Sequence, residues 1–132
     1  ELMNYSRQRE AILNCLQGRY DHPSADMVFD SVKNEFPNIS LGTVYRNLTL
    51  LCDTGDIIKV TSVNGVDRFD FNTTPHCHFI CSKCTKVQDV DASMDEIINR
   101  DELVKVPGSI ERTEVMVYGL CQECRENSLA ID

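Results

Sequence analysis

Four of the seven cysteines form two CxxC pairs, and this arrangement constrains the fold more than any other feature of the sequence. The pairs are Cys81/Cys84 and Cys121/Cys124. A turn of this spacing lets both sulfurs bind one Zn²⁺ ion, which takes four thiolates in a tetrahedral arrangement. Disulfides are rare in the cytosol, so the two pairs together predict a structural zinc site that ties two distant segments of the chain.

A thioredoxin-like redox pair is the alternative use of a CxxC motif. That use needs a βαβ context and a CxxC at the N-terminus of a helix. We expect neither here, because each pair follows a predicted strand. The remaining cysteines, Cys15, Cys52 and Cys77, lie beside apolar residues and are expected to be small buried side chains.

The charge of the chain limits its binding partners. The formal net charge is −8, which argues against a protein that coats nucleic acids generally, because phosphate binding depends on Lys and Arg. Residues 36–52 contain no acidic side chain, so a narrow DNA contact stays open there. The sequence has no long apolar run and no secretory signal, and we therefore expect a cytoplasmic protein.

The first half of the sequence predicts three helices followed by a β-hairpin. The predicted helices cover residues 6–18, 24–36 and 40–55. Ser6, Ser24 and Ser40 are placed to cap them. Asn64-Gly65 is a strong hairpin signal between two alternating segments. This order of elements is typical of a winged helix-turn-helix, which we assign to residues 1–72.

The second half predicts a small α+β unit. Asn72 to Pro75 ("NTTP") has the composition of a hinge. Beyond it we expect strands at 76–82, 86–90 and 113–120, and a helix from Ser93 to about Leu103. The fold class is therefore α+β, with a second, metal-binding domain over residues 73–132.

The third predicted helix presents two different faces. Its buried stripe is apolar, whereas its other face carries polar or planar side chains that can meet a DNA duplex: Thr43, Tyr45, Arg46 and Asn47. An arginine can bind guanine or phosphate, and Tyr and Thr can contact thymine methyls or phosphates. These four residues are our candidate DNA contacts.

Strand geometry separates the two histidines of "PHCHFICSKC" from its cysteines. In an extended segment His76 and His78 point to one side, while Cys77 and Cys81 point to the other. A single site that used both histidines and both cysteines of the CxxC would fold the strand back on itself. Two separate metal sites are the easier arrangement.

The second site needs ligands from elsewhere in the chain. The third histidine, His22, precedes a proline. Asp70 ends the second strand of the predicted hairpin, and Asp89 lies in the predicted strand after the first CxxC pair. Read alone, these are a loop residue and two solvated carboxylates. Together with His76 and His78 they offer three imidazoles and two carboxylates, a donor set that suits Fe(II) or Mn(II) better than a thiolate site does.

Six motifs in order resemble one known family. They are "SRQREAIL", "HPSADMVFDSV", "FPNISLGTVYRNL", "RFDF", "HCHFICSKCTKVQDV" and "YGLCQEC". Over nearly the whole chain the sequence is similar to the ferric uptake regulator (Fur) superfamily of bacterial metal-dependent repressors. The resemblance implies a homodimer, a winged helix that binds an inverted-repeat DNA operator, a dimerisation domain over residues 73–132, and a four-cysteine zinc site.

The resemblance also implies a regulatory metal site. Position by position, it falls on His22, Asp70, His76, His78 and Asp89. Both carboxylates are aspartates, as in the peroxide-sensing branch, whereas iron-uptake members tend to carry glutamates. The implied mechanism is reaction of bound Fe(II) with hydrogen peroxide, oxidation of His22 or His76, and release of DNA.

The sequence departs from the family pattern at two places. Residues 107–115 hold no histidine where many members place one or two for an additional sensory site. The chain also begins close to the first motif, so we expect the N-terminal segment of some members to be short or missing.

Three other functions stay open. One is an iron-, manganese- or zinc-responsive uptake repressor of the same family, and another is a zinc-ribbon interaction module, which would leave His22 and Asp70 unexplained. The third is a non-haem metalloenzyme. An enzyme should offer open coordination positions and a concave pocket, and five protein ligands leave little room for a substrate, so we do not expect an enzyme.

Overall fold

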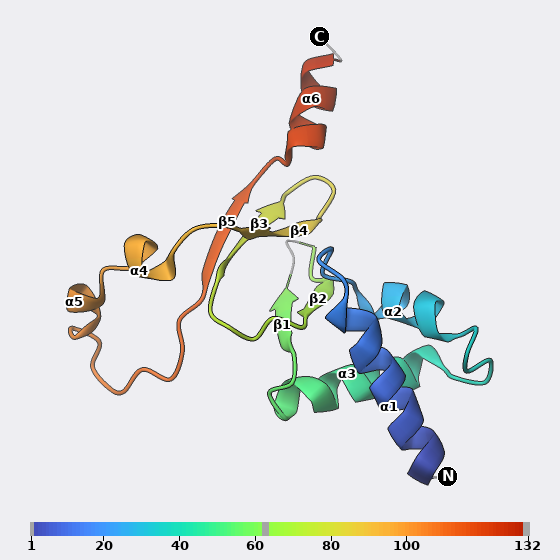
Figure 1. Ribbon diagram of the computed structural model, residues 1–132. Helices are drawn as coiled ribbons and strands as arrows, with labels where there is room; N and C mark the ends of the chain where they lie inside the picture. The colour runs from blue at the N-terminus through green and yellow to red at the C-terminus, as the bar shows by residue number, and fades with distance from the viewer. Residues whose placement is uncertain (1, 62–63, 131–132) are drawn as a thin grey trace. The chain divides into compact units, whose positions relative to one another are not determined.

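The computed structural model describes residues 2–61 and 64–130 and divides the chain into two compact units, 1–73 and 74–132 (Figure 1). The first unit contains α1 to α3 and the hairpin β1–β2. The second contains the strands β3 to β5 and the helices α4 to α6. No helix among the described residues has the length and apolar character needed to span a membrane.

The three helices of the first unit are α1 (Leu2–Gln17), α2 (Ala25–Val32) and α3 (Leu41–Asp53). The Ser24 hydroxyl accepts a hydrogen bond from the Met27 N–H at 3.4 Å, and the Ser40 hydroxyl accepts one from the Thr43 N–H at 3.1 Å. These two caps are as the sequence predicts.

Two boundaries of these helices differ from the prediction. The first helix begins at Leu2, so Ser6 lies inside it rather than at its N-cap. Ser6 is exposed and can stay solvated within a helix, so it does not force a start there. The second helix ends at Val32, and the following turn brings Phe36 into the core from outside the helix.

One hydrophobic core holds the first unit together. Its buried members come from all three helices, the segments between them and the hairpin: Ile12, Leu16, Ala25, Val28, Val32, Phe36, Ile39, Val44, Leu48, Leu51, Ile57 and Phe69. The apolar stripe of each helix therefore faces the same interior.

The hairpin completes the winged helix-turn-helix. The strands β1 (Ile58–Thr61) and β2 (Asp67–Asp70) pair antiparallel, with Ile58 opposite Asp70. Gly65 has φ +80, and the Asn64 side-chain oxygen accepts a hydrogen bond from the Val66 N–H at 3.2 Å. Glycine supplies the left-handed conformation that the turn needs.

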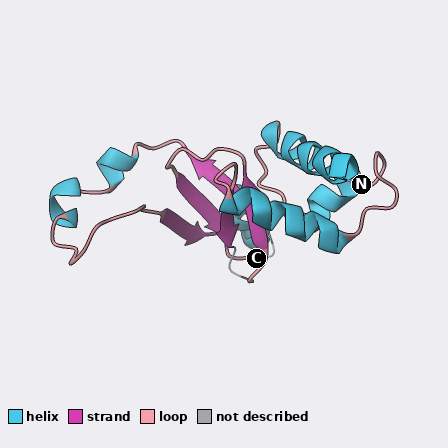
Figure 2. Cartoon of the chain, turned by 90° about the horizontal axis from the view of Figure 1, so that it is seen from below, coloured by secondary structure: helices cyan, strands magenta, loops and turns pink. Residues whose placement is uncertain are grey.

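The second unit is built on a three-stranded sheet (Figure 2). Its strands are β3 (Cys77–Cys81), β4 (Val87–Val90) and β5 (Val115–Gly119), in the order β4-β3-β5. The central strand β3 pairs antiparallel with β4 and parallel with β5. This register sets His78 directly opposite Asp89.

The helices of the second unit differ from the prediction. The segment expected to form one helix contains two short ones, α4 (Met94–Ile97) and α5 (Arg100–Leu103). The break is at Ile98, which is extended, and the Asn99 side chain then accepts a hydrogen bond from the Asp101 N–H at 3.0 Å. Asparagine is a strong N-cap and so competes with continuation of the first helix.

A further helix, α6 (Gln122–Ala130), was not predicted. It begins directly after Cys121, the first cysteine of the second CxxC pair. Its sequence, "QECRENSLA", contains few apolar residues and no clear apolar stripe, so helical periodicity could not reveal it.

Candidate metal centres

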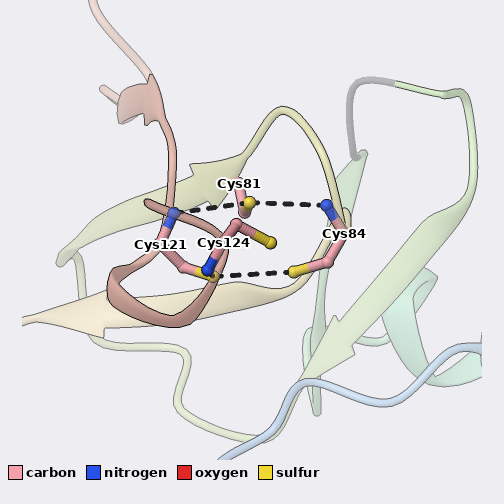
Figure 3. A group of neighbouring side chains, drawn as sticks. All are labelled: Cys81, Cys84, Cys121 and Cys124. Carbon is pink, nitrogen blue, oxygen red and sulfur yellow. Dashed lines mark hydrogen bonds between the residues drawn. The ribbon is translucent and has the colours of Figure 1, made fainter. Parts of the chain in front are cut away.

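The four paired cysteines come together at one end of the three-stranded sheet (Figure 3). All four Sγ atoms lie within 4.8 Å of one another, and those of Cys84 and Cys121 are 3.8 Å apart. A tetrahedral Zn²⁺ ion with Zn–S bonds of about 2.3 Å requires sulfurs about 3.8 Å apart. Parallel pairing of β3 with β5 is what delivers the two CxxC pairs to the same place.

Backbone N–H groups point at the sulfurs. Cys81 Sγ accepts hydrogen bonds from the N–H groups of Cys84 and Cys121, both at 3.4 Å, and Cys121 Sγ accepts one from the Cys124 N–H at 3.4 Å (Figure 3). Such donors stabilise thiolates and orient metal ligands. The fold therefore builds the surroundings of a thiolate metal site from its own backbone.

The pKa of Cys81 shows this preference for the thiolate. Burial, the largest single influence, raises the pKa of Cys81, but the backbone N–H groups of Cys121, Cys84 and Lys83 outweigh it and lower the pKa to about 6. The pKa of Cys124 is instead raised to about 12, chiefly because its thiol is hydrogen-bonded to Cys121. The backbone donors of the cluster therefore favour the thiolate form of Cys81.

One of the two arguments against the redox alternative was wrong. Cys121 directly precedes α6 and Cys124 lies within it, so the second CxxC pair does sit at a helix N-terminus. The four sulfurs nevertheless share one cluster, which is the geometry of a zinc site rather than of a single reactive pair. The clustering of all four cysteine sulfurs is therefore the observation that supports a zinc site.

The first unit contains one imidazole–carboxylate pair. His22 Nε2 lies 3.0 Å from Asp70 Oδ2, and both side chains are buried. The other oxygen, Asp70 Oδ1, accepts a hydrogen bond from the Asn72 N–H at 2.9 Å. A carboxylate held in this way keeps one oxygen directed at the imidazole.

The second unit contains a matching group of two imidazoles and one carboxylate. His76 Nε2 lies 2.9 Å and His78 Nε2 lies 3.5 Å from Asp89 Oδ1, and the two rings are 4.2 Å apart between centroids. His76 Nδ1 lies 2.6 Å from the Thr74 carbonyl oxygen, a second contact typical of metal-binding histidines. The three possible metal-binding atoms, His76 Nε2, His78 Nε2 and Asp89 Oδ1, therefore lie together.

The five predicted regulatory ligands thus fall into two preformed groups, one in each unit. His22 and Asp70 form the first, and His76, His78 and Asp89 form the second. Nitrogen and hard oxygen donors in this ratio fit Fe(II) or Mn(II), just as the four thiolates fit Zn²⁺.

The candidate DNA contacts lie on α3 with unequal exposure. Tyr45 is 46% exposed and Arg46 is exposed, whereas Thr43 is half-buried. Asn47 differs from the prediction because its side chain is buried: it accepts a hydrogen bond from Arg9 Nε at 3.3 Å and donates one to the Thr43 carbonyl at 3.0 Å. In this structure Asn47 links two helices rather than facing solvent.

Arg9 is a residue that the sequence analysis missed. It lies on α1 and lines the same surface cavity of about 520 Å³ as Arg46. Its link to Asn47 joins residues 38 positions apart, a contact that no local pattern in the sequence could reveal.

Comparison with known proteins identifies the family. The model of the ferric uptake regulator family matches residues 2–118. The peroxide-responsive repressor PerR of Staphylococcus epidermidis is 37% identical over 120 residues, which cover 90% of this chain and 79% of that protein.

Two solved structures share the fold. The Campylobacter jejuni peroxide stress regulator superposes with a TM-score of 0.79 at 29% identity and covers 92% of both chains. A zinc uptake regulator complexed with zinc and DNA has a TM-score of 0.67 at 24% identity and covers 92% of this chain and 83% of that one. Together with the two CxxC pairs and the winged helix, these similarities show that the chain belongs to the ferric uptake regulator family of metal-responsive repressors.

Proposed function

We propose that the chain is a peroxide-sensing repressor whose regulatory ion is held by His22, Asp70, His76, His78 and Asp89. The observation that carries this proposal is the presence of an imidazole–carboxylate group in each unit, with Nε2 atoms 2.9–3.5 Å from an aspartate oxygen. Neither group alone offers enough ligands for a stable site, whereas the two together offer five. Two carboxylates also neutralise a divalent cation.

An ion shared by both units would control DNA binding through geometry. It would fix the angle of the winged helix relative to the second unit, and in a dimer it would set the separation of the two α3 helices. Half-sites on DNA are read one helical turn apart, so binding is sensitive to that separation. Metal binding would then select the DNA-competent arrangement. Operator binding would place the protein in the cytoplasm.

The sensing step would oxidise a ligand histidine. Fe(II), when bound, supplies the redox chemistry that opens the O–O bond of hydrogen peroxide. One peroxide oxygen is added to a ring carbon of His22 or His76, and the other leaves as water with the displaced ring hydrogen. The oxidised ring is a poorer ligand, so the two units are no longer held together and DNA is released. The aspartate pair and the names of the similar proteins support this subtype.

Mass spectrometry tests the peroxide step directly. The protein is loaded anaerobically with Fe(II), treated with peroxide, and digested, with a sample that contains only zinc as the control. We expect one added oxygen atom on the peptide of His22 or His76 and loss of operator binding in the Fe(II) sample alone. If no histidine is modified and operator binding survives, the peroxide assignment fails. Operator affinity with Mn(II), Fe(II) and Zn(II) then separates the uptake repressors.

A matched pair of aspartate variants tests the regulatory site. Asp89 contacts both histidines of the second unit, whereas Asp91, two residues further on, is exposed. Asp89→Ala is expected to weaken Mn(II)-dependent operator binding by about 10–100-fold while the zinc content stays the same. Asp91→Ala should behave like the wild type. Equal Mn(II) dependence in the two variants contradicts the proposed site.

We propose that α3 binds the operator through Tyr45 and Arg46, with Thr43 beside them. Tyr45 and Arg46 are exposed on α3, and Arg46 can bind guanine or phosphate. Arg46→Ala is expected to lose about 1–3 kcal/mol of operator binding. Arg112→Ala removes an exposed arginine from the second unit and is the control, with unchanged affinity expected. Equal losses in the two variants would instead indicate general electrostatic attraction.

We propose that the second unit forms the homodimer. It leaves a large set of apolar side chains at least 43% exposed: Ile97, Val104, Val106, Ile110, Val117, Tyr118 and Leu120. Three of these lie on or just after β5, an edge strand whose outer side is open to another chain. Exposed apolar patches of this kind mark association surfaces.

Sedimentation tests the dimer. Val117→Lys introduces a charge on β5 and is expected to shift the protein to a monomer, because charged residues on an edge strand oppose pairing. Tyr20→Lys changes a still more exposed apolar residue, in the first unit, and should leave the dimer intact. A Val117→Lys protein that sediments as the wild type contradicts the use of β5.

A further inference from the structure

The backbone of His22 has an unusual conformation. Its φ is 52, in the left-handed region that residues other than glycine seldom adopt, and the side chain is buried. Such a conformation persists only where the surroundings over-determine it, and it is common at ligand-binding sites. The question is which contacts hold His22 in place.

Three successive residues of β2 hold the loop that contains His22. Arg68 Nη1 donates to the His22 carbonyl oxygen at 3.4 Å, and the Phe69 N–H donates to the Pro23 carbonyl oxygen at 3.0 Å. Asp70 Oδ2 lies 3.0 Å from His22 Nε2. The second strand of the hairpin thus holds the backbone carbonyl groups of His22 and Pro23 as well as the His22 ring.

Of these three contacts, that of Arg68 is the one made by a side chain to the backbone of His22 itself. Arg68 Nη1 also lies 3.3 Å from Met27 Sδ on α2, and its Nε is buried with no hydrogen-bond partner among the described residues. A guanidinium that only bound solvent or DNA phosphate would not be turned inward in this way. Its position indicates a role inside the unit.

We propose that Arg68 is a positioning residue for the regulatory metal. By holding the His22 carbonyl it keeps His22 in the left-handed conformation in which the imidazole meets Asp70. Without this donor the backbone can relax toward ordinary φ values, and the ring then leaves the position from which it binds metal. This inference rests on the proposed function, since it assigns a partner to a ligand of the regulatory site.

Two substitutions of Arg68 separate positioning from packing. Arg68→Met keeps an unbranched side chain against Met27 but removes the donor, and Arg68→Lys keeps a donor and the charge. In the zinc-loaded full chain, Arg68→Met is expected to raise the Kd for Mn(II), measured by electron paramagnetic resonance, by about 10–100-fold. Arg68→Lys should recover part of that loss. Arg112→Met, which changes an exposed arginine of the second unit, should match the wild type.

Thermal unfolding and zinc content provide the readout for a purely structural role. If Arg68→Met lowers the unfolding temperature but the folded protein binds Mn(II) as tightly as the wild type, the proposal is overturned. It is also overturned if Arg68→Lys binds Mn(II) no better than Arg68→Met.

Nuclear magnetic resonance of the protein without Mn(II) or Fe(II) makes the test independent of the regulatory metal. We expect the His22 ring resonances to shift in Arg68→Met and to return toward the wild-type position in Arg68→Lys. Unchanged resonances overturn the role of Arg68. If the variants show these shifts but the wild-type chain binds no Mn(II), the proposed function is overturned and Arg68 remains the residue that positions His22.

Discussion

The N-terminal unit buries twelve apolar side chains in one cluster drawn from three helices, the segments between them and the hairpin. In the C-terminal unit the buried apolar side chains among the described residues are Cys77, Ile80, Cys81, Val87 and Cys121. Two of these five, Cys81 and Cys121, are candidate zinc ligands, and many apolar side chains of α4, β5 and the segment between α5 and β5 are exposed. The first unit is therefore stabilised by its core, whereas the second has little core of its own.

This difference agrees with the size of the units. A segment of about sixty residues buries a small fraction of its surface and is marginal without additional stabilisation. Structural zinc, oligomerisation or both can supply it. In the C-terminal unit the four cysteines lie where they can join β3 to β5, and the exposed apolar residues are available for a partner. The DNA-binding unit needs neither device, so its stability can be independent of metal.

The largest expected effect is that of losing zinc. Structural zinc contributes an apparent free energy of about 10–16 kcal/mol at neutral pH in small domains. Cys121→Ser, or removal of zinc by a chelator, is expected to unfold the C-terminal unit and leave the N-terminal unit folded. Hydrogen exchange measures this as lost amide protection in β3 and β5 with retained protection in α3.

Cys15→Ser is the matched control, because Cys15 lies on α1 of the N-terminal unit and is not a member of the sulfur cluster. It should keep the zinc content and the protection of both units. If Cys121→Ser retained the amide protection of β3 and β5, the C-terminal unit would be stable without its metal, and the contrast between the two units would be incorrect.

A substitution that creates a cavity in the N-terminal core should have the opposite effect, because it should destabilise the N-terminal unit and leave the zinc site intact. Leu48 is fully buried in that core, and Leu48→Ala is expected to cost about 2–5 kcal/mol of unfolding free energy. The loss should appear in the denaturant transition of the N-terminal unit, while the zinc content remains unchanged. Leu50→Ala, at an exposed position of the same helix, should cost far less. Loss of zinc in Leu48→Ala would indicate that the units unfold together.

The features that the sequence predicted well depend on short-range chemistry. Ser24 and Ser40 cap their helices because a cap needs only the first turn. Asn64-Gly65 lies between the paired strands β1 and β2, where Gly65 adopts a φ of +80 that few other residues adopt. Strand alternation likewise predicted that His76 and His78 share a side, and both contact Asp89.

The features that it missed depend on contacts between distant segments or on competition between similar signals. Asn47 looked like a surface residue because nothing in the sequence reveals its link to Arg9. The break before Asn99 was missed because a good capping residue is also tolerated inside a helix. The start of α6 at the second CxxC has no periodic signal, so the helix became visible only in the structure.

Helix capping gives a smaller expected difference in stability between the two units. In α3 the Ser40 hydroxyl accepts the Thr43 N–H, whereas at the corresponding position of α4 the Ser93 side chain makes no capping hydrogen bond. Ser40→Ala is expected to cost the N-terminal unit about 1 kcal/mol, and Ser93→Ala should have an effect too small to resolve. Chemical denaturation measures both. Equal costs would show that local helix ends contribute alike to the two units.

The smallest expected effect is a pH dependence of the N-terminal unit. The Arg19 guanidinium donates two hydrogen bonds to the carboxylate of Asp21, the residue before His22, and these hold the pKa of Asp21 below its usual value of 3.8. A carboxyl group whose pKa is lowered in the folded state stabilises that state at pH values above its unfolded pKa of 3.8. This stabilisation is lost as the pH falls through the folded pKa. Because the Asp21 side chain is 51% exposed, solvent screening limits this contribution to about 0.2–1 kcal/mol.

Asp21→Asn isolates this contribution, because it removes the titrating group and keeps the side-chain shape. The variant should be slightly less stable than the wild type at pH 6, and the difference should vanish below the folded pKa and shrink in high salt. The C-terminal unit should respond to acid at higher pH, because protons compete with zinc for the thiolates. Zinc release should therefore precede the loss of the Asp21 contribution as the pH is lowered. Simultaneous acid unfolding of both units would mean that the metal site and the apolar core are not independent sources of stability.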